Sequence, residues 1–159
     1  SAEKLESAKG LVDAEFFCGD MTKTIPGKEA SYDLVFVDAP CSGFGVLRRR
    51  PEIRLLRQPS DVEGLRDLQQ AILRNTARAV RPGGVLLYAL CTFTQVEGSK
   101  GVEAFLKTEE GALFERIELP APPVSTWSRD AFSWSTFDDP KAVVAPADTF
   151  FAAAFRRRG

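Results

Sequence analysis

The chain has 159 residues, of which 44% are hydrophobic, enough to build the core of one domain of ordinary size. Its 21 basic and 22 acidic side chains leave a net charge of -1, so a nucleic-acid partner would have to be met by a local basic patch. Three widely spaced cysteines without any histidine match no zinc site or disulfide framework, and no stretch is long and apolar enough to span a membrane. We therefore expect a cytoplasmic protein with no membrane segment and no metal.

Strands and helices alternate along the first two thirds of the chain, which is typical of an α/β protein with a parallel sheet. The second strand, bounded by Asp33 and Asp38, is so apolar that we expect it to be covered on both faces. In chain order, the pattern predicts a helix end at 2–9, strands at 12–18 and 34–37, a helix at 61–80, a strand at 85–91 and a helix at 95–107. A capping box of Ser60 and Glu63 marks the start of the long helix.

The last third of the chain has a different character. Segments 113–119 and 149–155 have strand-like patterns, and we expect them to form an antiparallel pair at the edge of the sheet. Between them, 120–146 is rich in Pro, Ser and Asp and is predicted to be a long loop, of the kind that is usually functional or mobile. With no internal repeat, residues 1–159 are expected to form a single domain.

Four reactive side chains follow predicted parallel strands. Asp20 follows the first strand, Asp38 and Cys41 follow the second, and Cys91 ends the third. Because the carboxyl ends of parallel strands meet at one edge of a sheet, we expect all four groups to face one crevice. The absence of histidine excludes Ser-His and Cys-His hydrolases, so the two thiols indicate group transfer.

Three parts of the sequence resemble parts of a known family. Asp38-Ala39-Pro40-Cys41-Ser42-Gly43, with the arginine-rich stretch that follows it, resembles the fourth motif of the Sun/NOL/NSUN (RsmB-like) RNA cytosine-5 methyltransferases. Arg81-Pro82-Gly83-Gly84 and Leu87-Tyr88-Ala89-Leu90-Cys91-Thr92, with Glu97, resemble the sixth motif, and Asp148-Thr149-Phe150-Phe151-Ala152-Ala153 resembles the closing strand. The resemblance implies a Rossmann-like methyltransferase fold that uses S-adenosylmethionine and acts on cytosines of RNA, with rRNA favoured over tRNA.

The resemblance also implies a role for each site residue. Cys91 corresponds to the nucleophile that adds to carbon 6 of cytosine, and Cys41 to the cysteine that helps product release. Asp20 and Asp38 are the implied cofactor-binding acids: Asp20 would bind the adenosine part of the cofactor, and Asp38 would orient either the cofactor or the exocyclic amine of the base. The implied RNA contacts are Arg48, Arg49, Arg50 and Arg54.

The chain departs from the family pattern mainly at its start. A glycine-rich loop and an acid after a preceding strand, which hold the cofactor in the family, are not found. We therefore expect an amino-terminally truncated domain, lacking its first strand-helix-strand unit, that is inactive alone and binds S-adenosylmethionine weakly. Two alternatives remain at this point: a Rossmann methyltransferase with another substrate, and an RNA-binding relic without catalysis. The sequence does not indicate an oligomeric state.

Overall fold

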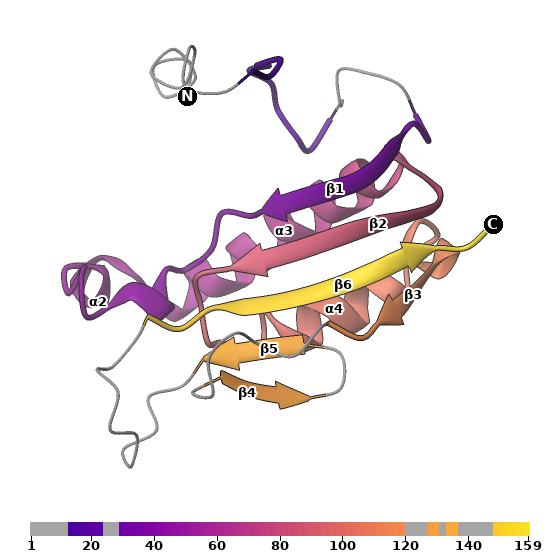
Figure 1. The fold of residues 1–159 in the computed structure, drawn as a ribbon. Helices are drawn as coiled ribbons and strands as arrows, with labels where there is room; N and C mark the ends of the chain where they lie inside the picture. Colours follow the sequence, from indigo (N-terminus) through magenta and orange to yellow (C-terminus); the bar gives the residue numbers. More distant parts are fainter. Residues whose placement is uncertain (1–12, 24–28, 120–126, 131–132, 137–147) are drawn as a thin grey trace.

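The computed structural model describes residues 13–23, 29–119, 127–130, 133–136 and 148–159 of the chain (Figure 1). The elements are β1 (Tyr32–Asp38), η1 (Phe44–Val46), α2 (Ile53–Leu56), α3 (Pro59–Ala77), β2 (Val80–Leu90), α4 (Ser99–Leu106), η2 (Gly111–Leu113), β3 (Phe114–Ile117), β4 (Trp127–Asp130), β5 (Ser133–Thr136) and β6 (Phe151–Arg157). No helix among these described residues is long and apolar enough to cross a membrane. The predicted helix end at 2–9 and the aromatic residues Phe132 and Phe137 lie outside the described residues.

A six-stranded sheet forms the centre of the structure, in the order β1-β2-β6-β5-β4, with β3 pairing with β6 as well. Strands β1 and β2 are parallel, and the other pairs are antiparallel. The predicted antiparallel pairing of the last strand with 113–119 is confirmed, but its position at the edge is wrong, because β6 lies inside the sheet next to β2. Small residues Ala153 and Ala154 and the fully buried Phe155 suit β6 to this interior position.

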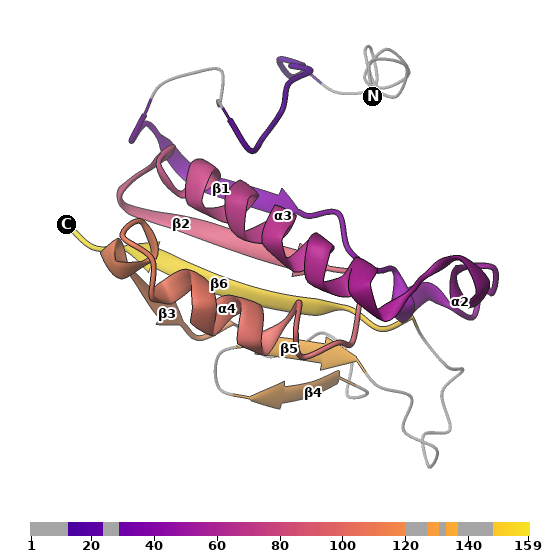
Figure 2. The same cartoon turned by 180° about the vertical axis from the view of Figure 1, so that it is seen from behind.

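Both long helices pack on the same face of the sheet (Figures 1 and 2). The core lies between that face and the helices, and its fully buried members include Leu73, Leu86, Tyr88, Phe105 and Phe155. The expectation that β1 is buried on both faces is wrong for the described residues. Leu34 and Phe36 are 57% and 59% exposed, whereas the alternate residues Val35 and Val37 pack into the core.

The predicted strand at 12–18 is absent from the described residues 13–18, which form no regular structure. A strand needs a hydrogen-bonded neighbour, and in the described part of the chain none of the sheet's strands pairs with this segment. Phe17 is consequently 55% exposed. The structure thus has two parallel strands, not three, at the end where the site was expected.

The long helix exists as predicted, with different ends. It begins at Pro59, and its capping box joins Gln58 to Asp61 rather than Ser60 to Glu63. Proline at the first helical position needs no hydrogen-bonded N–H, which explains the earlier start. The helix ends at Ala77, before its predicted end at residue 80, and residues 80–84 form the start of β2. The next helix, α4, is shorter than the predicted 95–107, and β4 and β5 occupy part of the predicted loop 120–146.

Candidate active site

Two cysteines from different loops meet at the carboxyl ends of β1 and β2. Strand β1 ends at Asp38 and β2 at Leu90, and because the strands are adjacent and parallel, the loops that follow them lie together (Figure 1). The Sγ atoms of Cys41 and Cys91 are 3.0 Å apart, within hydrogen-bonding distance for sulfur. The structure therefore brings together these two of the four predicted site residues.

The two thiols of the pair differ in acidity. The hydrogen bond from Cys41 lowers the pKa of Cys91 to about 7, although burial and the nearby charges of Asp38 and Glu97 act in the opposite direction. The same hydrogen bond, together with burial, raises the pKa of Cys41. The pair thus favours a thiolate on Cys91 near neutral pH, with the Cys41 thiol as its hydrogen-bond donor.

Glycine residues allow the two loops to approach closely. Gly45 donates its N–H to the carbonyl oxygen of Cys91 at 3.0 Å and accepts a hydrogen bond from the N–H of Thr149 at 2.8 Å. A Cβ atom at Gly45 would overlap the carbonyl oxygen of Thr149 and crowd the carbonyl group of Cys91. Gly43 has a φ of +76°, in the left-handed region that glycine adopts without strain. These two positions fix the path of the Cys41 loop against the Cys91 loop.

A fully buried carboxylate, that of Glu97, lies behind the cysteine pair. It accepts hydrogen bonds from the backbone N–H and hydroxyl of Ser42, from the hydroxyls of Thr92 and Thr94, and from the amide of Gln69. Burial by itself would raise the pKa of Glu97, but these hydrogen bonds outweigh it and lower the pKa. The side chain is therefore ionised at neutral pH and bound to residues adjacent to both cysteines.

A cavity of about 410 Å³ opens beside the cysteine pair. The two thiols line it, together with charged side chains that flank α2 on either side. Among the residues that line it are Cys41, Ser42, Cys91, Arg50, Glu52 and Arg57. A nucleophilic thiol and cationic groups thus share one concave site of the size that takes a small ring system.

The comparisons with known proteins decide the family. A model of the 16S rRNA methyltransferase RsmB/F family matches residues 4–156, nearly the whole chain. The chain belongs to the RsmB/F methyltransferase family.

Curated RsmB/F relatives are considerably longer than this chain. Ribosomal RNA small subunit methyltransferase B of Thermus thermophilus is 33% identical over 138 residues, which are 87% of this chain and 32% of that protein. The protein of the same name from Pasteurella multocida is 37% identical over 114 residues, 68% of this chain and 26% of that protein. The chain therefore spans about a quarter to a third of the length of these relatives.

Solved structures show the same fold. The crystal structure of PH0851 aligns with a TM-score of 0.68 at 27% identity and covers 86% of this chain and 29% of that one. NSun6 from Pyrococcus horikoshii, in a structure with SFG, aligns with a TM-score of 0.58 at 22% identity, over 78% of this chain and 29% of that one. The mixed sheet with its helices is thus the Rossmann-like fold of S-adenosylmethionine-dependent methyltransferases.

The two acids predicted for the RsmB/F cofactor site lie in different places. Asp38 ends β1. Its charge acts to raise the pKa of Cys91, against the larger lowering effect of the hydrogen bond from Cys41. Asp20 lies in an exposed turn, where hydrogen bonds from the hydroxyl and N–H of Thr22 lower its pKa and Lys23 forms an ion pair with it. The prediction that all four groups face one crevice is therefore wrong for Asp20, because the strand that was to carry it to the site does not form.

The turn of Asp20 is attached to a distant part of α3. Asn75 donates its side-chain amide to the carbonyl oxygen of Met21 at 2.9 Å. Gln69, earlier on the same helix, reaches the loop of Cys41 by donating to the carbonyl oxygen of Pro40. The turn thus lies further along α3, toward the end where β2 begins.

The predicted RNA-binding arginines are exposed, and they are only partly directed to the cavity. Arg50 lines it and forms an ion pair with Glu52, whereas Arg49 forms an ion pair with Asp148. Arg48 and Arg54 are exposed outside the cavity wall. Arg57, at the end of the same arginine-rich stretch, also lines the cavity, where the chain becomes extended after α2.

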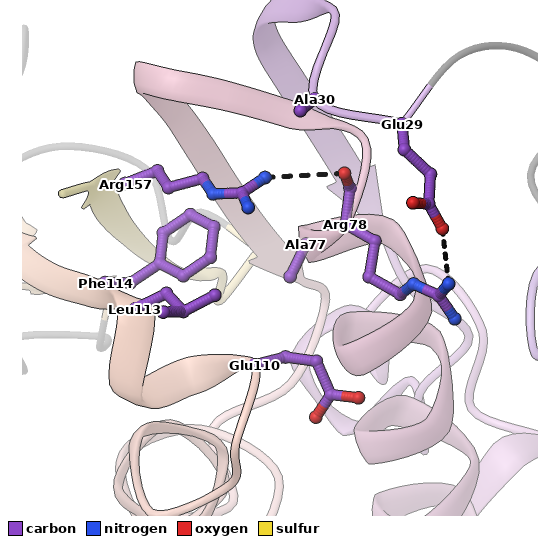
Figure 3. A pocket seen from close by; sticks show the side chains of 8 residues that line it. All are labelled: Glu29, Ala30, Ala77, Arg78, Glu110, Leu113, Phe114 and Arg157. Carbon is purple, nitrogen blue, oxygen red and sulfur yellow. Dashed lines mark hydrogen bonds and ion pairs between the residues drawn. The ribbon is translucent and has the colours of Figure 1, made fainter. Parts of the chain in front are cut away.

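A second, smaller hollow of about 160 Å³ lies at the other end of the sheet (Figure 3). Its two arginines already have partners: Arg78 is paired with Glu29, and Arg157 donates to the carbonyl oxygens of Arg78 and Val80. Because its cations are engaged and no thiol is near, we exclude it as the active site. Arg156 and Arg157 belong to the end of β6, and Arg157 ties this strand to Val80 of β2.

Sequence reasoning missed Gln69 as a site residue and found Glu97 only through the family motif. The signal for Gln69 was present, since it shares the buried face of α3 with Ile72, Leu73 and Thr76. A long amide on an otherwise apolar helix face needs a buried partner. That partner is Glu97, at 3.0 Å.

Proposed function

We propose that this chain is the base-handling part of an S-adenosylmethionine-dependent RNA cytosine-5 methyltransferase that acts on rRNA. The observation that carries the proposal is the contact of Cys41 with Cys91 on a cavity bordered by arginines. Membership of the RsmB/F family and relatives named ribosomal RNA small subunit methyltransferase B support the RNA substrate. The cytosine-5 chemistry rests on the pair of thiols together with the motif resemblance.

The role proposed for Cys91 is covalent activation of the base. Carbon 5 of cytosine is a poor nucleophile toward a methyl sulfonium. Addition of the Cys91 thiolate to carbon 6 forms a carbon–sulfur bond and moves the electrons of the 5,6 double bond toward carbon 5, which then becomes enamine-like. The pKa of about 7 for Cys91 supplies the thiolate near neutral pH.

The role proposed for Cys41 is proton removal. After carbon 5 has gained a methyl group, its proton must leave before the carbon–sulfur bond can break and restore the double bond. Cys41 lies 3.0 Å from the attacking sulfur and is therefore placed near carbon 5 of a base bound to Cys91. Once Cys91 is bonded to carbon, the hydrogen bond that raises the pKa of Cys41 is lost, which makes Cys41 available as the base.

Binding of RNA requires the target base to leave its stack. A cytosine inside a helix cannot present carbon 6 to a thiol in a cavity, so we propose that the base is flipped into the space of about 410 Å³. Arg50 and Arg57, on the wall of that space, are the proposed contacts to the flanking phosphates. Arg48 and Arg54 are proposed to contact phosphates further from the base.

The described residues fit the cofactor in part. S-adenosylmethionine would supply the methyl group for carbon 5, and Asp38 ends a strand at the edge where such folds bind their ligands. The carboxylate of Asp20 is engaged by Thr22 and Lys23 away from this edge. NSun6 was solved with SFG, an analogue of S-adenosylmethionine, which supports the same cofactor class here.

Trapping with RNA that contains 5-fluorocytosine tests the proposed chemistry. Fluorine at carbon 5 cannot be removed as a proton, so methylation leaves the enzyme joined to RNA. We would use a chimera in which this chain replaces the matching segment of its Thermus thermophilus relative. We expect an adduct that survives denaturant and disappears in Cys91→Ala. A chimera that binds RNA and S-adenosylmethionine but forms no adduct would instead support a relic without catalysis.

A further inference from the structure

The fully buried carboxylate of Glu97 joins the segments that carry the two thiols. Its Oε1 atom accepts hydrogen bonds from the N–H of Ser42 at 2.8 Å and from the amide of Gln69 at 3.0 Å. Its Oε2 atom accepts hydrogen bonds from three hydroxyls, those of Ser42 at 2.7 Å, Thr94 at 2.6 Å and Thr92 at 3.1 Å. One side chain therefore binds five donors on three separate segments.

These donors lie next to the cysteines in the chain. Ser42 follows Cys41 and Thr92 follows Cys91, and their hydroxyls are also 2.9 Å apart. Gln69 uses its remaining amide hydrogen to bind the carbonyl oxygen of Pro40 at 2.9 Å, just before Cys41. The carboxylate thus holds the Cys41 loop on both sides and the Cys91 loop on one side.

We propose that Glu97 is a positioning residue for the methyl transfer: its carboxylate fixes the Cys41 and Cys91 loops so that their Sγ atoms remain in contact. The inference rests on the proposed function only in giving the thiol pair a reaction to serve. Glu97 does not line the cavity and has no hydrogen bond to either sulfur, so it acts through Ser42 and Thr92.

The donor arrangement predicts which substitution preserves the contact. In Glu97→Gln, the amide oxygen can occupy the Oε1 position and accept from the two N–H donors. The amide nitrogen then faces hydroxyls, which can rotate to accept its hydrogens. Glu97→Ala removes the acceptor that these donors share in a buried site, so the two loops lose their common attachment. We expect glutamine to keep the thiols together and alanine to separate them.

The two variants should move the pKa of Cys91 in opposite directions. The groups that face this thiol are Cys41 from the neighbouring loop, Asp38 from β1, Glu97, and the cavity residues Arg50, Glu52 and Arg57. Cys41 lowers the pKa of Cys91, whereas the charges of Asp38 and Glu97 raise it. Glu97→Gln removes a negative charge that raises the pKa of Cys91, so we expect that pKa to fall below about 7. Alanine also removes the hydrogen bond from Cys41, which has the larger influence, so the pKa rises toward about 8.5.

The test uses the whole 159-residue chain with Cys18→Ser, because Cys18 is an exposed thiol that would obscure the readout. Alkylation of Cys91 by iodoacetamide is followed against pH by peptide mass spectrometry. In parallel, diamide is used to join Cys41 and Cys91; the disulfide forms as both thiols lose their hydrogens and diamide is reduced to the hydrazine. The first readout reports the pKa of Cys91, and the second reports how often the two sulfurs meet.

Matched variants separate positioning from general destabilisation. Gln70→Ala is the control, since Gln70 joins α3 to the carbonyl oxygen of Gly101 without reaching the cysteine loops. We expect Glu97→Ala to slow disulfide formation by about tenfold or more, a factor that corresponds to about 1.4 kcal/mol. We expect Glu97→Gln to stay within about threefold of the parent with a lower midpoint of alkylation, and Gln70→Ala to match the parent in both readouts.

Each result decides the inference. Parent-like rates and midpoints in Glu97→Ala overturn it, and so does an equal loss in Gln70→Ala. If Glu97→Ala does not fold, Glu97→Gln decides alone, because disulfide formation slowed by more than about threefold in that variant contradicts the proposed arrangement. Neither readout uses RNA or S-adenosylmethionine, so a failure here leaves the proposed function standing, and a failed RNA-trapping experiment leaves the role of Glu97 standing.

Discussion

At the scale of single residues, the properties of the site depend on which side chains donate and which accept its hydrogen bonds. Two thiols at 3.0 Å share a hydrogen bond, and this contact makes Cys91 the more acidic of the two. Glu97 is ionised in a buried place only because five donors surround it. The sequence could place Cys41 and Cys91 at the ends of neighbouring strands. It could not predict the acceptor behind them, because Glu97 and Gln69 meet only after α3 has packed against the sheet.

The lowered pKa of Glu97 predicts a specific loss of stability in acid. A carboxyl group with a folded-state pKa below its ordinary value of 4.5 stabilises the fold above that value, and the stabilisation is lost as the pH falls through the folded-state pKa. We therefore expect the parent to be more stable than Glu97→Gln at neutral pH and the difference to shrink as the pH falls below 4.5. Urea unfolding of both proteins at several pH values measures this difference in unfolding free energy. A difference in unfolding free energy that is constant with pH would contradict this account.

At the scale of elements, local sequence patterns predicted the presence of helices and strands better than the residues at which they begin and end. The apolar periodicity of α3 and the continuous apolar runs of β1 and β2 identified these elements. The start of α3 was missed because Gln58 and Asp61 form the capping box in place of Ser60 and Glu63. The strand expected at 12–18 fails for a different reason, since strand propensity is expressed only where a neighbouring strand supplies hydrogen bonds.

The contact between the η1 segment and the Cys91 loop predicts unequal effects at two glycines. We expect Gly45→Ala to destabilise the chain by about 1–3 kcal/mol, because the added methyl group meets the carbonyl oxygen of Thr149. Gly64→Ala is the control: nothing lies within 4 Å of its added Cβ atom in α3, so we expect a gain of about 0.5–1 kcal/mol. Thermal or urea unfolding checks both values. Equal effects at the two positions would show that the loops are not in close contact.

At the scale of the whole molecule, the structure presents a thiol site beside a sheet face that none of the described helices covers. Helices α3 and α4 lie on the other face, and Leu34 and Phe36 of β1 are exposed. The chain spans only about a quarter to a third of its curated relatives. The family resemblance predicted the Rossmann-like fold correctly, but the covering of both faces that such folds usually have is not present in the described residues.

This incomplete layer predicts weak cofactor binding by the chain alone. Asp38 is the one proposed cofactor contact at the site edge, since Asp20 is held by Thr22 and Lys23 elsewhere. We expect isothermal titration calorimetry of the 159-residue chain to detect no binding of S-adenosylmethionine in the micromolar range. A micromolar dissociation constant would show that contacts other than these acids suffice.

The roles of the two thiols can be separated by one comparison of covalent RNA complexes. In the chimera with the Thermus thermophilus relative, incubated with S-adenosylmethionine and RNA that contains ordinary cytosine, Cys41→Ala should stop the reaction after Cys91 has bonded to carbon 6. A complex stable to denaturant should then accumulate on a gel. Cys91→Ala should form none, because the bond-forming thiol is gone. A complex that accumulates in Cys91→Ala but not in Cys41→Ala would contradict the assignment of the nucleophile.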